Sequence, residues 1–250
     1  MLNIAHRGFS GKYPENTMLA FEKAIEAGAD GIEFDVHFSK DGELVIIHDE
    51  RIDRTTDGKG FVVDYTYDEL SRFDASATFT GVYGFNKIPT LREYFELVKP
   101  IDGFITNIEL KTGVNEYPGI EKAVYELIKE FGLEKRIIIS SFNHYSVMRF
   151  KEIAPEIVCG YLTGDWVYNF GEYTKTRGVE CVHPRFNSLN SQSVAEIKSN
   201  GIRINTWTVN DEDEVKRLYN LGTDAVITNF PDMAKRVIEN AKRQKNDDIF

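Results

Sequence analysis

The chain has 250 residues, with 30 Lys and Arg against 40 Asp and Glu, and its formal net charge is −10. A chain of this length can bury a full core, and barrels of alternating strands and helices reach this size as one domain. The negative charge, with no Lys and Arg stretch comparable to a nucleic-acid-binding stripe, disfavours nucleic acid as a partner. It does not exclude a small phosphate ester, because a few fixed cations or a bound metal can reverse the field locally.

The N-terminus carries no pattern typical of a targeting segment. Residues 1–6 lack the positive start, the apolar stretch and the small-residue cleavage site of a signal peptide. No apolar run approaches the roughly 18 residues that span a bilayer. We therefore expect a soluble, cytoplasmic protein without a membrane span. Cys159 and Cys181 lack the spacing of a zinc site and are expected to be buried, small apolar side chains.

The first elements of the chain alternate between strand and helix patterns. The pattern predicts a strand at residues 3–6, an amphipathic helix at 17–27 that stops at Gly28, and a second strand at 31–37. Residues 44–48 also have the composition of a strand, but residues 39–43 are too few for a parallel crossover. This segment must therefore return antiparallel to the second strand.

Residues 49–88 form a predicted insertion after that hairpin. Thr66 and Glu69 have the spacing of a capping box, which predicts a short helix. An insertion that leaves the top of a barrel strand is placed to cover a site there. Most of its aromatic side chains are expected instead to form a small satellite core, and they are Phe61, Tyr65, Tyr67, Phe73, Phe79, Tyr83 and Phe85.

From residue 100 onward one unit repeats: a β-branched run, a polar turn, an amphipathic helix and a terminating glycine. The predicted strands are residues 104–110, 137–142, 158–162, 180–183, 202–209 and 225–229. The helices between them end near Gly132, Gly178, Gly201 and Gly222. Strands separated by helices pair in parallel, so the chain is predicted to be an α/β protein, a TIM-type (β/α)8 barrel of eight parallel strands plus the antiparallel one.

His6 and Arg7 lie at the end of the first predicted strand, followed by Gly8. Barrels place catalytic groups at the carboxyl ends of their strands. This strand end combines a titratable ring, a permanent cation and a glycine that permits close backbone approach. These residues are therefore the first candidates for a functional site.

Three carboxylates point to the same interior. Strand alternation sends Glu33 and Asp35 to one face of the second strand, and it sends Glu109 and Lys111 inward from the strand at 104–110. Unpaired interior carboxylates repel one another unless a cation lies between them. All-oxygen ligands suit Mg²⁺ or Ca²⁺ better than zinc. The rival interpretation is a salt-bridge network with Lys111 and Arg7.

His48 supplies a second histidine, followed by Asp49, at the same end of the barrel. Two imidazoles at one site allow one to take a proton from a nucleophile while the other gives one to a leaving group. A bound cation, Arg7 and Lys111 would stabilise charge on a phosphoryl oxygen. Trp207, on one predicted strand face with Asn205 and Val209, could pack against the apolar part of a substrate or fill the barrel.

At this point the residues resemble the glycerophosphodiester phosphodiesterase family, in its bacterial cytoplasmic type. The matching motifs keep one order from residue 6 to about 111: His6-Arg7-Gly8, Glu15-Asn16-Thr17, Glu33-Phe34-Asp35-Val36, Lys40-Asp41-Gly42, His48-Asp49, Arg54-Thr55-Thr56, Ile88-Pro89-Thr90-Leu91 and Glu109-Leu110-Lys111. Weaker matches follow at Ser141-Phe142, Trp207-Thr208-Val209 and Thr228-Asn229-Phe230-Pro231. The family usually has Asp where this chain has Asn229.

The resemblance implies one catalytic barrel domain over residues 1–250, with the family insertion at about 49–88. It implies a divalent cation, Mg²⁺ or Ca²⁺ with Mn²⁺ as a further candidate, on the three-carboxylate set Glu33, Asp35 and Glu109. It also implies His6 and His48 as the acid-base pair and Arg7 and Lys111 as phosphate ligands. The implied reaction hydrolyses a glycerophosphodiester to glycerol 3-phosphate and an alcohol such as choline or ethanolamine.

Several alternatives stay open at this level. Lysophospholipids are alternative substrates, because the aromatic insertion could accept an acyl chain. A noncatalytic phosphate-ester binding protein would not need two histidines. Lys111 could be a Schiff-base lysine, although Glu109 nearby favours its charged form. The sequence leaves the oligomeric state open, a homo-oligomer included.

Overall fold

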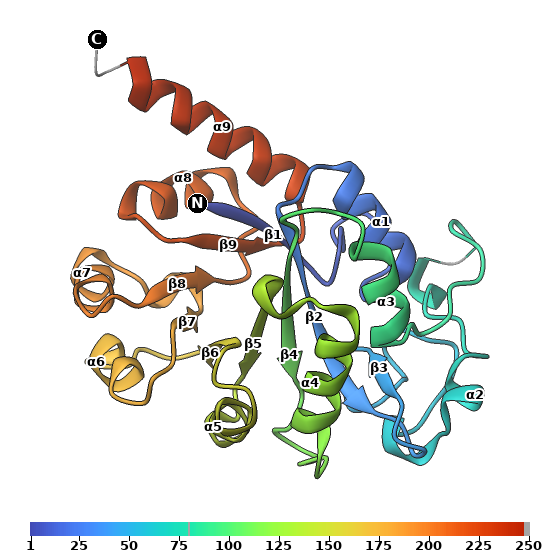
Figure 1. Ribbon diagram of the computed structural model, residues 1–250. Coiled ribbons are helices and arrows are strands. Elements are labelled where there is room, and N and C mark those ends of the chain that lie inside the picture. The colour runs from blue at the N-terminus through green and yellow to red at the C-terminus, as the bar shows by residue number, and fades with distance from the viewer. Residues whose placement is uncertain (80, 248–250) are drawn as a thin grey trace.

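The computed structural model describes residues 1–79 and 81–247, and its centre is a closed barrel of parallel strands surrounded by helices (Figure 1). The strands are β1 Leu2–His6, β2 Gly31–Phe38, β3 Leu44–Ile46, β4 Ile105–Leu110, β5 Ile137–Ser141, β6 Val158–Thr163, β7 Cys181–Pro184, β8 Arg203–Thr206 and β9 Ala225–Thr228. They follow the order β1-β9-β8-β7-β6-β5-β4-β2-β3, and β1 also pairs with β2. That pairing closes the eight parallel strands into the predicted barrel.

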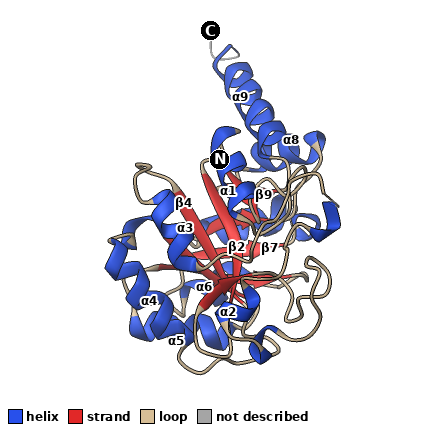
Figure 2. Ribbon diagram, turned by 90° about the vertical axis from the view of Figure 1, so that its right-hand side faces the viewer, coloured by secondary structure: helices blue, strands red, loops and turns tan. Residues whose placement is uncertain are grey.

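Helices cover the outside of the barrel, and the strands lie inside them (Figure 2). The helices are α1 Met18–Glu26, α2 Tyr67–Leu70, α3 Leu91–Val98, α4 Ile120–Phe131, α5 His144–Ile153, α6 Phe170–Lys175, α7 Ser191–Ser199, α8 Glu212–Leu221 and α9 Pro231–Asp247. The side chain of Thr17 accepts a hydrogen bond from Ala20 and caps α1. Gly132 and Gly222 end α4 and α8 in the left-handed conformation, as their positions predicted.

Strand β2 divides its side chains between two environments. Ile32, Phe34 and Val36 belong to the main core between strands and helices, where the Phe34 ring meets the ring of Tyr94 at 4.4 Å. The alternate residues, Glu33 and Asp35, therefore face the barrel interior, as predicted. Because a shift of one residue would bury the carboxylates among the helices instead, the apolar face fixes the register that delivers them to the site.

Strand β3 pairs with β2 in antiparallel register, with Val36 opposite Ile46. The chain then enters the insertion, which contains α2 and lies beside β3 at one side of the barrel (Figure 1). Its predicted capping box is present at Thr66 and Glu69, and it opens α2. Of the seven aromatic side chains considered for a satellite core, Tyr65, Tyr67 and Phe73 pack against a separate apolar cluster of this region. Phe61 and Phe85 are exposed instead, so the expectation that most of the seven join this core is wrong.

The predicted strand at 202–209 is too long. Strand β8 ends at Thr206, and a cis peptide bond joins Trp207 to Thr208. Trp207 packs with Ile4 and Ile227, whereas Val209 joins the main core. The prediction that Trp207 and Val209 share one strand face is therefore wrong, because alternation applies only within a continuous strand.

The remaining structural expectations concern cysteines and membrane spans. Cys159 and Cys181 are both buried and free, as expected for small apolar side chains. None of the described helices combines the length and the apolar composition that crossing a bilayer requires.

Candidate active site

The predicted site residues come together at the carboxyl ends of the strands. His6 ends β1, Glu33 and Asp35 lie on β2, and Glu109 lies on β4, with His48 two residues beyond β3. Of these residues, His6, Glu33, His48 and Glu109 line a pocket of about 80 Å³. Its lining residues are His6, Arg7, Glu33, His48, Asn107, Glu109, Phe142, Leu162, Trp207, Thr208 and Ile227.

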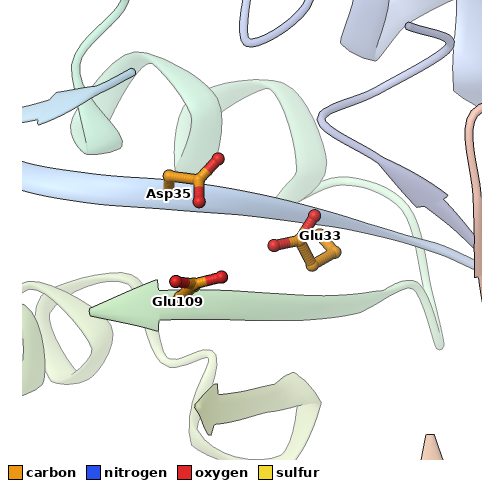
Figure 3. A group of neighbouring side chains, drawn as sticks. All are labelled: Glu33, Asp35 and Glu109. Carbon is orange, nitrogen blue, oxygen red and sulfur yellow. The ribbon is translucent and has the colours of Figure 1, made fainter. Parts of the chain in front are cut away.

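The three carboxylates face one another across β2 and β4 (Figure 3). Asp35 lies opposite Glu109 in the strand register. One oxygen from each of Glu33, Asp35 and Glu109 lies within 4.8 Å of the others. Their exposed fractions are only 4%, 1% and 8%, so water screens their charges poorly.

This crowding separates the pKa values of the three acids. Burial, then the charges of Asp35 and Glu109, raise the pKa of Glu33 well above its usual range. Burial also raises the pKa of Glu109. Burial acts in the same direction on Asp35, but Arg7 and Lys111 outweigh it and hold the pKa of that carboxyl well below its usual range.

The donor set fits a hard divalent cation. Every donor is an oxygen, which is what Mg²⁺ and Ca²⁺ take in proteins. Within the described part of the chain, the buried Oδ1 atoms of Asp35 and Asn107 have no hydrogen-bond partner. A cation at this position would offset the repulsion between Glu33, Asp35 and Glu109.

Two cations flank the carboxylates. The Arg7 Nη1 lies 2.8 Å from Oε1 of Glu15, and its Nε lies 3.4 Å from Oδ2 of Asp35. The Lys111 Nζ lies 3.0 Å from Oε1 of Glu109 and 3.7 Å from Oδ1 of Asp35. Burial alone would lower the pKa of Lys111, but the two carboxylates outweigh it and raise this pKa. Arg7 and Lys111, the two cations of the predicted salt-bridge alternative, therefore do contact the carboxylates.

His6 is held from the neighbouring strand, because Asn229 directly follows β9, which pairs with β1. Its Nδ1 lies 2.7 Å from Oδ1 of Asn229, and its Nε2 lies 3.9 Å from Oε2 of Glu33. Burial, followed by the positive charge of Arg7, lowers the pKa of His6 to about 4. The ring is therefore neutral at neutral pH, with its proton on Nδ1 when the amide oxygen of Asn229 is the acceptor.

His48 contacts charged groups on both ring nitrogens. Its Nδ1 lies 2.5 Å from Oδ1 of Asp49, and its Nε2 lies 3.3 Å from Nζ of Lys111. Burial raises the pKa of Asp49, but hydrogen bonds from Arg54 and His48 outweigh it and lower this pKa to about 2. Asp49 is therefore an ionised acceptor throughout the neutral range.

Three polar residues of the site received no individual role from the sequence. Arg54 donates to both oxygens of Asp49 and both oxygens of Glu15, which links the insertion to the Arg7 side of the site. Asn16 donates to Oδ2 of Asp35 at 3.0 Å. The signal that could have identified these three residues is their position in motifs that resemble the family, Glu15-Asn16-Thr17 and Arg54-Thr55-Thr56. Local sequence patterns alone do not show which loops contact one another.

Trp207 lies on the apolar side of the pocket. Its Nε1 donates to the backbone oxygen of His183 at 2.8 Å, and its ring meets Phe142 edge-on at 5.5 Å. Phe142 stays 47% exposed at the pocket. The pocket thus has one charged side and one apolar side. The fold and the site together define a (β/α)8-barrel protein that carries, beside two histidines, a buried acidic cluster that fits a divalent cation.

Comparisons with known proteins give the same class. The model of the glycerophosphoryl diester phosphodiesterase family matches residues 6–233. A glycerophosphodiester phosphodiesterase of Bacillus altitudinis is 45% identical over 241 residues, which cover 96% of this chain and 98% of that protein. Another, from Caldanaerobacter subterraneus, is 43% identical over 231 residues, which cover 92% and 95%.

A solved structure is similar along nearly the whole fold. The Oleispira antarctica phosphodiesterase, in complex with the product sn-glycerol-3-phosphate, has a TM-score of 0.88 and 33% identity, covering 94% of this chain and 96% of that one. The chain therefore belongs to the glycerophosphoryl diester phosphodiesterase family and is a phosphodiester hydrolase. The predicted family, fold and enzyme class are confirmed.

Proposed function

We propose that this chain hydrolyses glycerophosphodiesters to glycerol 3-phosphate and an alcohol, in a reaction that needs a divalent cation and two histidines. The observation that carries the proposal is the placement of His6 and His48 on one pocket whose wall also includes Glu33 and Glu109. The product in the Oleispira structure supports the same substrate class. We further propose that the barrel and its insertion, about 49–88, act as one domain.

Glu33, Asp35 and Glu109 would hold the cation, Mg²⁺ or Ca²⁺ with Mn²⁺ as a further candidate. When bound, the cation neutralises charge on the phosphoryl oxygens. Arg7 and Lys111 would bind the same phosphate, since both present N–H donors beside the acids. The apolar side of the pocket, with Trp207 and Phe142, would pack against the carbon skeleton of the substrate.

His6 is the proposed base of the first step. Its Nε2 is the ring nitrogen that Asn229 leaves free, so it can take the proton of the neighbouring glycerol hydroxyl. That oxygen forms a bond to phosphorus while the bond from phosphorus to the alcohol oxygen breaks. His48 then gives a proton to the departing alcohol, and Asp49 stabilises the charged ring that this role requires.

A cyclic glycerophosphate results from the first step, and water opens it in the second step. His48, now without its proton, takes one from the attacking water, and His6 returns its proton to the glycerol oxygen that leaves phosphorus. Both histidines regain their starting states, and the product is glycerol 3-phosphate. The reversal follows because each ring ends the first step in the form that the second step needs.

Two alternatives from the sequence, a Schiff-base lysine and a lysophospholipid substrate, can be compared with this geometry. A Schiff-base lysine needs a lowered pKa, whereas the contacts of Lys111 with Glu109 and Asp35 raise it. Lysophospholipids stay an alternative, because Phe61 and Phe85 of the insertion are 41% and 62% exposed and leave apolar surface for an acyl chain. Small glycerophosphodiesters are the proposed substrates, since neither ring lines the pocket that His6 and His48 share.

A substrate panel tests this proposal. Release of glycerol 3-phosphate from glycerophosphocholine and glycerophosphoethanolamine should depend on added Mg²⁺, Ca²⁺ or Mn²⁺ and should stop with EDTA. Lysophosphatidylcholine should be a poor substrate under the same conditions. Faster turnover of the lysolipid would replace the proposed substrate class, and full turnover in EDTA would remove the cation from the proposal.

A further inference from the structure

We propose that His37, which the mechanism above does not use, is a positioning residue that holds the main chain of His48 in place. The inference rests on the proposed role of His48. Nε2 of the His37 ring lies 3.1 Å from the backbone oxygen of His48, and its Nδ1 lies 3.0 Å from the hydroxyl of Tyr117. The ring thus joins the strand β2, the end of the hairpin and the loop that follows β4.

The chemistry of these partners fixes the direction of both hydrogen bonds. A carbonyl oxygen only accepts, so the proton of His37 lies on Nε2 and is donated to His48. Nδ1 is then an acceptor, and the hydroxyl of Tyr117 donates to it. The two bonds run in one direction, from Tyr117 through His37 to His48.

Burial makes this chain of bonds rigid. His37 is 0% exposed, and Tyr117 is 6% exposed with its ring edge-on to the imidazole at 5.6 Å. Tyr117 itself has a φ of +48°, a conformation that L residues rarely adopt without local constraint. Because water does not reach His37, neither ring nitrogen has a solvent partner to replace a lost bond.

The position of His37 in the hairpin explains why a side chain, and not the backbone, bonds to His48. The backbone bond from Ile47 to Asp35, at 3.1 Å, continues the pairing of the hairpin beyond β3. The next contact along the chain is the bond from His37 to His48, so the imidazole extends the ladder where the strands diverge. Asp49 and Lys111 orient the ring of His48, whereas His37 sets the position of its backbone.

Loosening this support should affect turnover more than substrate binding. The contacts of the proposed phosphate ligands with the carboxylates, Arg7 with Asp35 and Lys111 with Glu109, involve neither His37 nor His48. His37→Leu should lower kcat on the order of 10-fold or more, with KM nearly unchanged, because small misplacements of a catalytic group are costly. His37→Gln should recover most of kcat, since its amide can donate to His48 and accept from Tyr117.

The decisive measurement is a double-mutant cycle with His48→Ala, followed through kcat. The effect of His37→Leu should vanish once His48 is absent; an undiminished effect would overturn the proposal. Tyr117→Phe should lower kcat in the same direction by a smaller factor, and it serves if His37→Leu fails to fold. Tyr125→Phe, which removes an exposed hydroxyl bonded to Glu156, is the matched control.

A second readout does not depend on activity. Imidazole nitrogen NMR of the intact protein should find His37 as the neutral Nε2–H form, and Tyr117→Phe should shift its Nδ1 resonance. An Nδ1–H form would contradict the inferred bonds. If His48→Ala alone retains full turnover, the proposed function of His48 fails, whereas the NMR result on His37 is judged separately.

Discussion

Lys111 donates a hydrogen bond to Nε2 of His48 across 3.3 Å. An ammonium group has no lone pair, so Nε2 must be the acceptor and the proton of a neutral His48 lies on Nδ1, toward Asp49. Asp49 holds Nδ1, so Nε2 is the nitrogen that must carry the proton given to the alcohol in the proposed first step. A bound phosphate, which attracts the ammonium of Lys111, would free Nε2 of His48. Substrate binding would then be coupled to the ability of His48 to carry a proton on this nitrogen.

The first prediction concerns this lysine. Lys111→Met should lower kcat/KM about 10²-fold, because it removes a charge from the proposed phosphate site. Steady-state kinetics on glycerophosphocholine measures the effect. Lys122→Met is the control, since Lys122 on α4 is 70% exposed and forms an ion pair along its own helix with Glu126. Equal losses in both variants would contradict a specific role for Lys111.

The second prediction concerns the two histidines. His6→Ala and His48→Ala should each lower kcat about 10²-fold or more, the usual contribution of a positioned acid or base. His144→Gln should have little effect, because His144 lies on α5 and bonds to Tyr173 and the backbone of Leu162. Thermal melting checks that each variant folds. Full turnover in either alanine variant would sink the assignment.

The fold could be predicted because its signals are local. Three of these signals relate residues that are only a few positions apart in the sequence: the alternation on β2, the capping box at Thr66 and the short turn at residues 39–43. The end of β8 could not be predicted in this way. Residues 207–209 have strand composition, yet Trp207 and Val209 separate into two clusters, which depends on tertiary packing.

The site was predictable where strand ends converge and unpredictable where loops meet. Glu33, Asp35 and Glu109 follow from alternation and parallel pairing alone. The contact of Asn229 with His6 likewise joins the ends of two paired strands, β9 and β1. Arg54, in contrast, lies in the insertion and reaches Glu15 across 39 positions of sequence. Such contacts depend on how insertions fold over the barrel, which residue spacing does not encode.

The third prediction concerns the cation. Mg²⁺ or Ca²⁺ at about 100 times its dissociation constant should stabilise the protein by about 2.7 kcal/mol, because it binds only the folded cluster. The melting temperature of the wild type should rise accordingly, and that of Glu109→Gln should rise less. Glu96→Gln, an exposed carboxylate on α3, is the control. An identical rise in all three proteins would place the cation elsewhere.

The fourth prediction concerns the stability of the cation-free protein as pH changes. The folded pKa of Glu33 is raised, so the folded state holds a proton that the unfolded chain has lost above its ordinary value of 4.5. Stability from this group is present at low pH and is lost as pH rises through the folded pKa. Each pKa unit of the rise corresponds to about 1.4 kcal/mol.

Glu33→Gln removes this titration without changing the shape of the side chain. In EDTA the variant should therefore be more stable than the wild type at pH 8, and the difference should shrink as pH falls toward 4.5. Urea unfolding at several pH values measures it. A difference that stays constant across this range would mean that Glu33 is not strained by its neighbours.

The last prediction concerns Asn229 and the base that it holds. The pKa of His6 is lowered to about 4 by burial and by Arg7, and the hydrogen bond with the uncharged amide of Asn229 opposes this only in part. Asn229→Asp would place a carboxylate 2.7 Å from Nδ1, which favours the charged ring and should raise the pKa of His6 by about one to three units. A base must be neutral to act, so the acidic limb of the kcat/KM profile should move to higher pH by the same amount. Asn220→Asp, with the same charge change on the exposed side of α8, should leave the limb in place. If the Asn229 variant leaves it there as well, His6 is not the base of the first step.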